Sequence, residues 1–198
     1  MSFFDILMRG GWMMLPIYLC FLLMCVVGCE RWIVQRRVGW EGKVDDLDRF
    51  LDRLRRDDRE GAARAARELP PTLAALAALA VAGASPARLA VEISERTDEL
   101  DANMAVLGTL AAVAPLLGFL GTAAGMIRAF MAIEDLAGAV TPAVLAGGIW
   151  EALVTTGAGL AAGIFGLLVH NILAARVDRM ATRLEDAAKL MADARTRP

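Results

Sequence analysis

Apolar residues gather in three long stretches of the chain. Residues 12–29 form the first stretch and contain no charged side chain. Arg128 is the only Asp, Glu, Lys or Arg in the second stretch, residues 107–133, and Glu151 is the only one in the third, residues 143–175. A helix of about 20 apolar residues crosses the roughly 30 Å hydrocarbon core of a bilayer. The pattern therefore predicts three transmembrane helices.

Between the first two stretches lies a charged segment, residues 30–106, with 13 Lys or Arg and 15 Asp or Glu residues. Leu47, Leu51 and Leu54 recur at helical spacing with charges between them, which is typical of an amphipathic helix that faces water. We expect this helix to continue to residue 68 and to end before the two prolines that follow.

Two further helices are predicted in the charged segment. Residues 72–84 are an Ala and Leu run that is too short to span a membrane comfortably, so we expect a helix packed within the soluble part. A turn is expected at residues 83–86. The pattern after this turn is helical and holds no breaker before the second apolar stretch. It predicts one helix that extends well beyond the membrane.

The predicted fold class is all-α, a three-span helical membrane protein whose long second and third helices extend into a cytoplasmic helical region. The expected layout is a short periplasmic N-terminus (1–11), a first span (12–29), a cytoplasmic helical segment (30–106), a second span (107–133), a short periplasmic loop (134–142), a third span (143–175) and a cytoplasmic tail (176–198).

The orientation follows from basic residues beside the spans, because Lys and Arg near a membrane end stay cytoplasmic. Arg31, Arg36 and Arg37 follow the first stretch and Arg176 follows the third, whereas residues 134–142 carry no base. We expect a multi-pass inner-membrane protein with a periplasmic N-terminus and a cytoplasmic C-terminus.

Two alternatives exist for the first stretch. One is a cleaved secretory signal, and the other is a lipoprotein signal, since residues 26–29 resemble a lipobox that ends in Cys29. The basic residues directly behind the stretch are typical of a stop-transfer sequence and favour an intact span.

Composition excludes several classes of protein. With 57% hydrophobic residues and a net charge of -2, the chain is not of the disordered type, and it has no basic excess for a nucleic-acid partner. Three cysteines in one apolar stretch do not indicate a disulfide scaffold. No cluster has the spacing of metal ligands or of a nucleophilic site. We therefore expect no metal, no cofactor and no enzymatic activity.

Glu151 is the outstanding candidate for function, because an ionised carboxylate at bilayer depth needs water, a partner or a proton. It lies eight residues into the third stretch, with Thr155 and Thr156 about one turn further along. A group that gains and loses a proton inside a membrane is what a proton path requires. The alternative is an interfacial, solvated glutamate without a function.

Small residues recur at three- and four-residue spacing in the last two stretches, which predicts two seams for close helix packing. The second stretch contributes Pro115, Gly118, Thr122, Gly125 and Ala129, with Gly121 beside them. The third contributes Ala152, Thr156, Gly159, Gly163, Gly166 and His170. Packing alone would explain the glycines, but it explains Thr122, Glu151 and Thr156 less well.

Two motifs carry a resemblance to a known family. AVAPLLGFLGTAAGMIRAF (112–130) is similar to the second-span signature of the MotA/TolQ/ExbB proton channel family, and GGIWEALVTTGAGLAAGIFGLLVHN (147–171) resembles its third-span motif. The layout resembles the ExbB/TolQ branch, because MotA-type members usually have four spans and a longer inner segment. ExbB and TolQ both fit.

The resemblance implies a channel subunit of a motor that couples the proton motive force to transport or envelope work at the outer membrane. It implies a ring of five such subunits around ExbD/TolR-type single-span partners, which pass motion to a TonB- or TolA-like transducer. By motif position, Thr122 and Thr156 would line the proton path and Glu151 would be the third-span glutamate. A non-conducting scaffold in the same kind of complex is the alternative.

Helix geometry qualifies these roles. Glu151 and Thr156 lie about 140° apart around an ideal helix, so they cannot both face one axis. We expect Thr156 to face the lumen and Glu151 a boundary between subunits. Arg128 is expected to snorkel to the interface and to pair with Glu134 or Asp135. His170 either relays protons or forms an interfacial hydrogen bond, and the second is the more common role.

Overall fold

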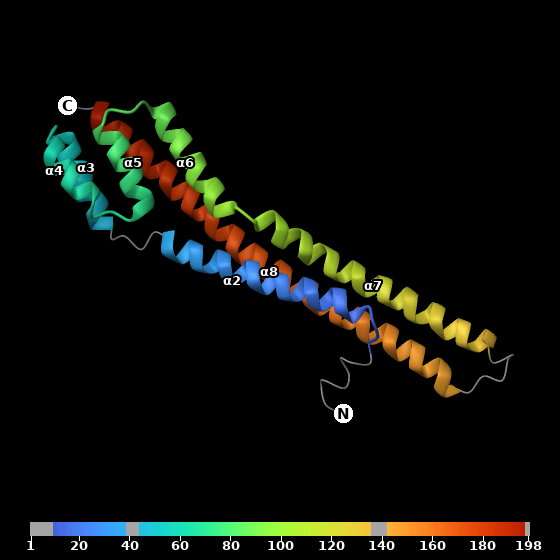
Figure 1. Ribbon diagram of the computed structural model, residues 1–198. Coiled ribbons are helices and arrows are strands. Elements are labelled where there is room, and N and C mark those ends of the chain that lie inside the picture. Colours follow the sequence, from blue (N-terminus) through green and yellow to red (C-terminus); the bar gives the residue numbers. More distant parts are fainter. Residues whose placement is uncertain (1–9, 39–43, 136–141, 197–198) are drawn as a thin grey trace. The chain divides into compact units, whose positions relative to one another are not determined.

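The computed structural model describes residues 10–38, 44–135 and 142–196, and over these ranges the chain is helical and has no strand. The helices are α2 (Met14–Val38), α3 (Val44–Arg55), α4 (Arg59–Ala66), α5 (Pro71–Val81), α6 (Pro86–Asp101), α7 (Met104–Asp135) and α8 (Pro142–Thr196), as Figure 1 shows. The all-α prediction is confirmed.

Three helical stretches are long and apolar enough to cross a membrane: Met14–Arg37, Pro86–Glu134 and Ala146–Ala194. In the most apolar window of each, a third of the residues or fewer are buried. Many large apolar side chains such as Leu15 and Leu116 point outward. Outward apolar faces on long helices are what lipid or neighbouring helices cover. The three-span prediction is confirmed.

The chain divides into two compact units. The first, which we call the membrane unit, comprises the described residues of 1–29 and 103–171. The second, the charged unit, comprises those of 30–102 and 172–198. Helices α2 and α8 contribute residues to both units.

In the membrane unit, α2 packs on α8 through one pair of aromatic rings and through side chains that fit against glycines. Phe21 and Phe165 stack with ring centroids 5.2 Å apart, and Met24 fills the space beside Gly166. Gly28 lies so close to Val169 that an added Cβ would meet its Cγ1 at 3.1 Å. Gly28 is therefore a packing position inside α2, where a lipobox would need an accessible cleavage site.

The charged unit is built around a core of leucine, alanine and methionine side chains from α3, α4, α5, α6 and the C-terminal part of α8. Leu47 and Leu51 of α3 are buried in it and Leu54 packs at its edge, as the spacing predicts. Phe50, Leu76 and Met191 are fully buried. The predicted Ala and Leu helix is α5, which begins at Pro71.

The helix expected to continue to residue 68 is interrupted. Asp57 has a left-handed backbone conformation, with φ 52°, and α3 has ended two residues before it. Asp58 then begins α4 by accepting a hydrogen bond from the Gly61 N–H at 2.9 Å. Aspartate both caps helices and tolerates positive φ better than most residues, so the Asp-Asp pair makes a turn where the charge pattern alone indicated helix.

The helix expected to run unbroken into the second span is also interrupted. Helix α6 ends at Asp101 and α7 begins at Met104. Asn103, with φ 62°, lies in the left-handed region that asparagine tolerates, and its carbonyl accepts from the Leu107 N–H at 3.1 Å. Asparagine is thus the breaker that the hydrophobic pattern did not reveal.

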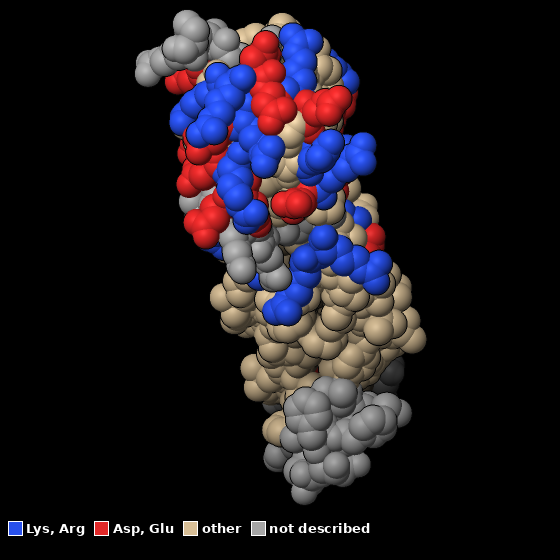
Figure 2. Space-filling model, turned by 90° about the vertical axis from the view of Figure 1, so that its left-hand side faces the viewer, with Lys and Arg blue, Asp and Glu red and all other residues tan. Residues whose placement is uncertain are grey.

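Charges of both signs are interspersed on the face of the charged unit seen in Figure 2. Many form exposed ion pairs within one helix or turn, such as Arg64 with Glu60 at 3.7 Å and Arg53 with Asp58 at 3.2 Å. Pairs of this kind contribute little to stability, because water screens them. They indicate a solvated surface.

Candidate functional site

The two lone charges of the second and third apolar stretches form an ion pair. Arg128 Nη2 of α7 donates to Glu151 Oε1 of α8 at 2.5 Å. The Glu151 side chain is 18% exposed and that of Arg128 is 43% exposed. Because α7 and α8 run antiparallel, the last turns of α7 lie beside the first turns of α8 (Figure 1).

The sequence interpretation of Arg128 was incomplete, since the structure pairs it with Glu151 on the next helix. Glu134, six residues on, is about 120° away around an ideal helix, and Asp135 is about 10 Å along the axis. A partner on the neighbouring helix is closer. The sequence did contain a signal for this pair, because Arg128 is the only charged residue of the second apolar stretch and Glu151 is the only one of the third.

A turn before α2 covers this ion pair. Gly11 has φ +65°, and its carbonyl accepts from the Met14 N–H at 3.2 Å. A Cβ at Gly11 would overlap the Glu151 carboxylate and lie 3.3 Å from Arg128 Nη2. Only glycine offers both this backbone conformation and this close approach. No pattern in the sequence marks Gly11.

The hydroxyls of Thr122 and Thr156 meet across α7 and α8. The two Oγ1 atoms are hydrogen-bonded to each other. Thr156 Oγ1 also donates to the Gly118 carbonyl at 3.1 Å, and the Ala152 carbonyl lies 3.3 Å from Thr122 Oγ1. Both side chains are half-buried. Two hydroxyls and two carbonyls therefore form one connected polar group inside the helix interface.

Glycines allow α7 and α8 to approach this closely. A Cβ on Gly118 would meet only backbone atoms of α8, among them Gly159 Cα at 3.2 Å. The same atom on Gly125 would lie 3.2 Å from Ala152, and on Gly163 it would overlap Pro115.

Thr155 lies in the centre of this interface and is fully buried. Its side chain fills the space over Gly121, and its hydroxyl donates to the Glu151 carbonyl. From the sequence, Thr155 was recognisable only as a neighbour of Glu151. Its burial on the α7-facing side could not be read from the spacing alone, because Thr156 fits the same seam.

The two polar pairs lie on opposite edges of the interface. The residues that α8 buries against α7, such as Ala152 and Gly159, lie between Glu151 and Thr156 around the helix. The 140° separation predicted on α8 is matched on α7, where Thr122 and Arg128 are about 120° apart. Thr156 thus meets Thr122 on one side of the small-residue seam, and Glu151 meets Arg128 on the other side.

His170 occupies a gap at Gly108. A Cβ on Gly108 would lie 3.2 Å from His170 Nε2, and His170 Nδ1 is 3.3 Å from Asn171 Oδ1. His170 lies fourteen residues beyond Thr156, close to a whole number of helical turns, so it shares the threonine edge. Relay and interfacial hydrogen bonding both remain predictions for this side chain.

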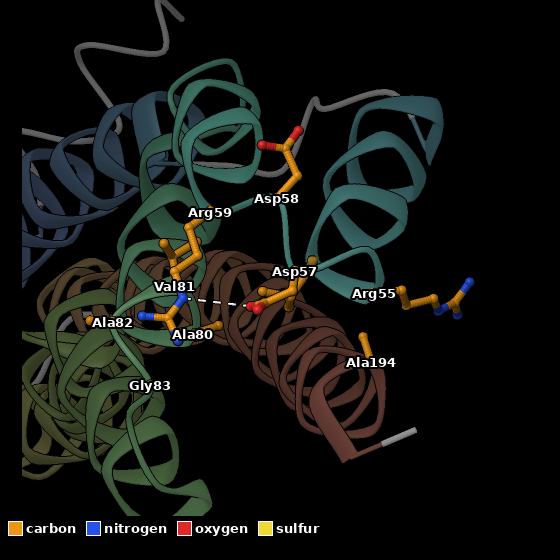
Figure 3. A pocket seen from close by; sticks show the side chains of 10 residues that line it. Arg55, Asp57, Asp58, Arg59, Ala80, Val81, Ala82, Gly83 and Ala194 are labelled. Carbon is orange, nitrogen blue, oxygen red and sulfur yellow. Dashed lines mark ion pairs between the residues drawn. The ribbon is translucent and has the colours of Figure 1, made fainter. Parts of the chain in front are cut away.

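The charged unit contains a cavity of ≈ 410 Å³ between the α3–α4 turn, the end of α5 and Ala194 (Figure 3). Its charged lining residues are on the turn, where Asp57 and Arg59 point toward each other at 3.5 Å and are largely exposed. These solvated charges offer no convergent set of polar groups. No group of three or more His, Cys, Asp or Glu that could hold a metal ion occurs among the described residues.

Comparison with known proteins identifies similar chains. Residues 71–186, more than half of the chain, match the family described as the MotA/TolQ/ExbB proton channel family. A relative in Synechocystis sp., named biopolymer transport protein ExbB-like 1, is 35% identical over 178 residues, which cover 85% of this chain and 69% of the relative.

Two shorter matches are to proteins named ExbB and TolQ. The biopolymer transport protein exbB1 of Vibrio cholerae is 32% identical over 93 residues, which cover 47% of this chain and 41% of that protein. The Tol-Pal system protein TolQ of Haemophilus influenzae is 36% identical over 86 residues, which cover 43% and 37%. The chain thus matches about two fifths of the length of these two relatives.

Proposed function

The chain belongs to the MotA/TolQ/ExbB proton channel family, and from this premise we propose that it is the proton-channel subunit of an ExbB/TolQ-type motor. It is a multi-pass protein of the inner membrane. Its task is to couple the proton motive force to transport or to envelope work at the outer membrane. The observation that carries the proposal is the polar group formed by Thr122 and Thr156 between two apolar helices.

Hydroxyl groups suit a proton path because each can donate and accept a hydrogen bond. The Thr156 hydroxyl already has the Gly118 carbonyl as an acceptor, and the Thr122 hydroxyl has a choice between the Gly118 and Ala152 carbonyls. Rotation of either hydroxyl changes which oxygen accepts its hydrogen bond. A carboxyl group presented to this edge would then exchange its proton with a prearranged pair of hydroxyls.

The carboxyl group is assigned to a partner. We propose that an ExbD/TolR-type single-span protein brings an acidic residue to the threonine edge, and that a ring of these subunits, five as a working number, encloses it. Protonation of that residue frees the partner to turn within the ring, and a TonB- or TolA-like protein transmits the motion.

The outward apolar side chains of all three long helices support assembly, because lipid and neighbouring subunits would cover them. Glu151 has a different role in this scheme, since it lies on the opposite edge from the threonines. We assign it to the boundary with a neighbouring subunit, where it and Arg128 form the second polar position of the proton pathway.

The proposed orientation puts residues 1–11 and 134–142 in the periplasm, and residues 30–106 and 176–198 in the cytoplasm. The clustering of bases in the last turns of α2 and in the C-terminal half of α8 supports it, because cytoplasmic ends of spans carry Lys and Arg. Within the charged unit, the Arg176 guanidinium lies 4.3 Å from the ring centroid of Trp32, and Arg36 lies 5.0 Å from the same ring. Tryptophan and arginine together are typical of a membrane interface.

The proposal is tested by proton flux. The chain is reconstituted in liposomes with an ExbD/TolR-type partner from the same organism, and proton uptake under an imposed gradient is followed with a pH-sensitive dye. Thr156→Val and Glu151→Gln are expected to lower the flux by about a hundredfold, the scale of a lost proton-transfer group. Thr109→Val is the matched control, because the exposed Thr109 hydroxyl bonds only the Ala105 carbonyl one turn back on α7.

A non-conducting scaffold is the second candidate. It is favoured by one observation, that both threonine hydroxyls have carbonyl partners inside the interface and so could serve packing alone. The scaffold predicts unchanged flux and unchanged energised function in both variants while the complex stays assembled. Equal flux in Thr156→Val, Glu151→Gln and Thr109→Val would therefore replace the motor proposal with the scaffold.

A further inference from the structure

Two neighbours lie against the Glu151 carboxylate in the membrane unit, and a third contacts its backbone carbonyl. Arg128 of α7 bonds Oε1, the turn at Gly11 covers the carboxylate, and the Thr155 hydroxyl caps the Glu151 carbonyl on α8 itself. Arg128 is the one charged side chain among the described residues that contacts the Glu151 carboxylate. Its Nε also donates to the Ala124 carbonyl at 3.3 Å, which holds the guanidinium against α7.

We propose that Arg128 is a positioning residue for proton transfer at Glu151. Its guanidinium holds the Glu151 carboxylate under the Gly11 turn. It also occupies the position on the carboxylate that a metal cation would otherwise take. This inference rests on the proposed function. It assigns to Arg128 and Gly11 the control of which ions reach Glu151.

Charge and geometry both support this role. A carboxylate that already binds a guanidinium at 2.5 Å has its charge neutralised, so a sodium ion gains little by approaching it. A proton differs, because it can bond covalently to Oε2, the carboxylate oxygen that the Arg128 contact does not use, and it needs no coordination shell. On proton uptake the carboxylate becomes a neutral carboxyl, no electrons are transferred, and the guanidinium keeps its charge but loses its anionic partner. The hydrogen bond from Arg128 to Oε1 therefore weakens when Glu151 takes up a proton.

Gly11 links the position of Glu151 to the turn formed by residues 10–13 before α2. Because Gly11 has no side chain, the Glu151 carboxylate fits against the turn, whereas a Cβ at this position would overlap it. Any displacement of Glu151 toward the turn must move the turn as well. The Gly11 turn and the Arg128 guanidinium can be altered separately, since Gly11 carries no charge and Arg128 lies on α7.

The test measures how fast dicyclohexylcarbodiimide labels Glu151 in the full chain in phospholipid nanodiscs, by mass spectrometry, in sodium chloride and in choline chloride of equal concentration. Glu151→Gln is the blank. In the wild type we expect slow labelling at the same rate in both salts. In Arg128→Gln we expect labelling about tenfold faster in choline, because one charge-assisted hydrogen bond has gone, and slower again in sodium.

Two further variants separate charge from cover. Arg128→Lys keeps a cation beside the carboxylate, so its labelling should be the same in sodium and in choline. Gly11→Ala displaces the turn while Arg128 stays, so its labelling should accelerate and still ignore sodium. If Arg128 only stabilised the fold, its replacement would not make the labelling rate of Glu151 depend on sodium.

The inference is overturned if sodium slows labelling of the wild type, which needs no variant, or if Arg128→Gln is labelled at the wild-type rate. Labelling requires neither a gradient nor a partner, so its outcome is independent of the flux assay. If the labelling rates are as expected but the flux is unaffected in both Thr156→Val and Glu151→Gln, the motor is refuted and the ion pair stands. If the flux falls in both variants but the labelling rates are not as expected, only the role of Arg128 is refuted.

Discussion

Gly118 of α7 and Gly159 of α8 lie against each other with no side chain between them. A Cβ on Gly159 would lie 2.8 Å from Gly118 Cα and 2.7 Å from the Ala114 carbonyl oxygen. Helices that touch at backbone distance bring short side chains within hydrogen-bond reach, which is why the Thr122 and Thr156 hydroxyls can meet. The polar group of the proposed path is thus a consequence of this glycine contact.

Gly159→Ala is expected to destabilise the chain by about 1–3 kcal/mol, since the new methyl group meets backbone atoms that cannot rotate away. Gly157→Ala is the matched control on the same helix, because nothing lies within 4 Å of a Cβ at that position. Thermal unfolding in detergent micelles measures both. Equal unfolding temperatures for the two variants would contradict the close approach of α7 and α8.

Thr122 and Thr156 should be energetically coupled. In a double-mutant cycle with valine at each position, we expect a coupling energy of about 0.6–1.7 kcal/mol, the range of hydrogen bonds between membrane helices. Urea or SDS unfolding of the four chains gives the value. The cycle of Thr109→Val with Thr156→Val serves as the control and should give additive effects, because the Thr109 hydroxyl bonds within its own helix.

The sequence predicted the long helices well because their signal is local. Apolar stretches without charges, and leucines at three- and four-residue spacing, are properties of consecutive residues, and α2, α3 and α5 follow them. The two breaks that were missed occur at Asp57 and Asn103, where a single backbone φ changes sign. Hydrophobic periodicity carries no information on such a change, because neither residue interrupts the apolar face.

The candidate site was predicted in its residues but not in its pairings. Thr122, Glu151 and Thr156 were recognisable as polar side chains in apolar stretches, whereas the contact of Arg128 with Glu151 depends on the antiparallel register of α7 and α8. Gly11 was out of reach for the same reason, since its function is defined by a carboxylate 140 residues further along the chain. Register is set by the fit of many small residues together, and no single spacing encodes it.

The proposed orientation is testable by side-specific labelling in a background where the three native cysteines are replaced by alanine. We expect Ser94→Cys on α6 and Lys189→Cys on α8, both at exposed positions of the charged unit, to react with a membrane-impermeant maleimide only after the inner membrane is opened. Ser2→Cys should react in intact cells with a permeabilised outer membrane. Reaction of either charged-unit cysteine from outside would reverse the orientation.

The Asp58 cap gives the charged unit an acid-sensitive component. The Gly61 N–H, with Arg53 as a weaker contributor, lowers the pKa of the Asp58 carboxyl below its ordinary value of 3.8. A group whose pKa is lower in the folded chain stabilises the fold above its unfolded-state pKa. That contribution is lost as the pH falls from about 3.8 through the lowered folded-state value.

Asp58→Asn should remove this acid-sensitive component while it keeps the helix cap, because asparagine caps α4 with a neutral oxygen. The measurement is the free energy of unfolding in urea between pH 6 and pH 2.5, compared with the wild type. Asp57→Asn is the control: it removes a charge from the neighbouring turn position, and asparagine tolerates the φ of 52° there. If both variants lost stability with acid as steeply as the wild type, the Gly61 contact would not be what holds the Asp58 carboxylate in its charged form.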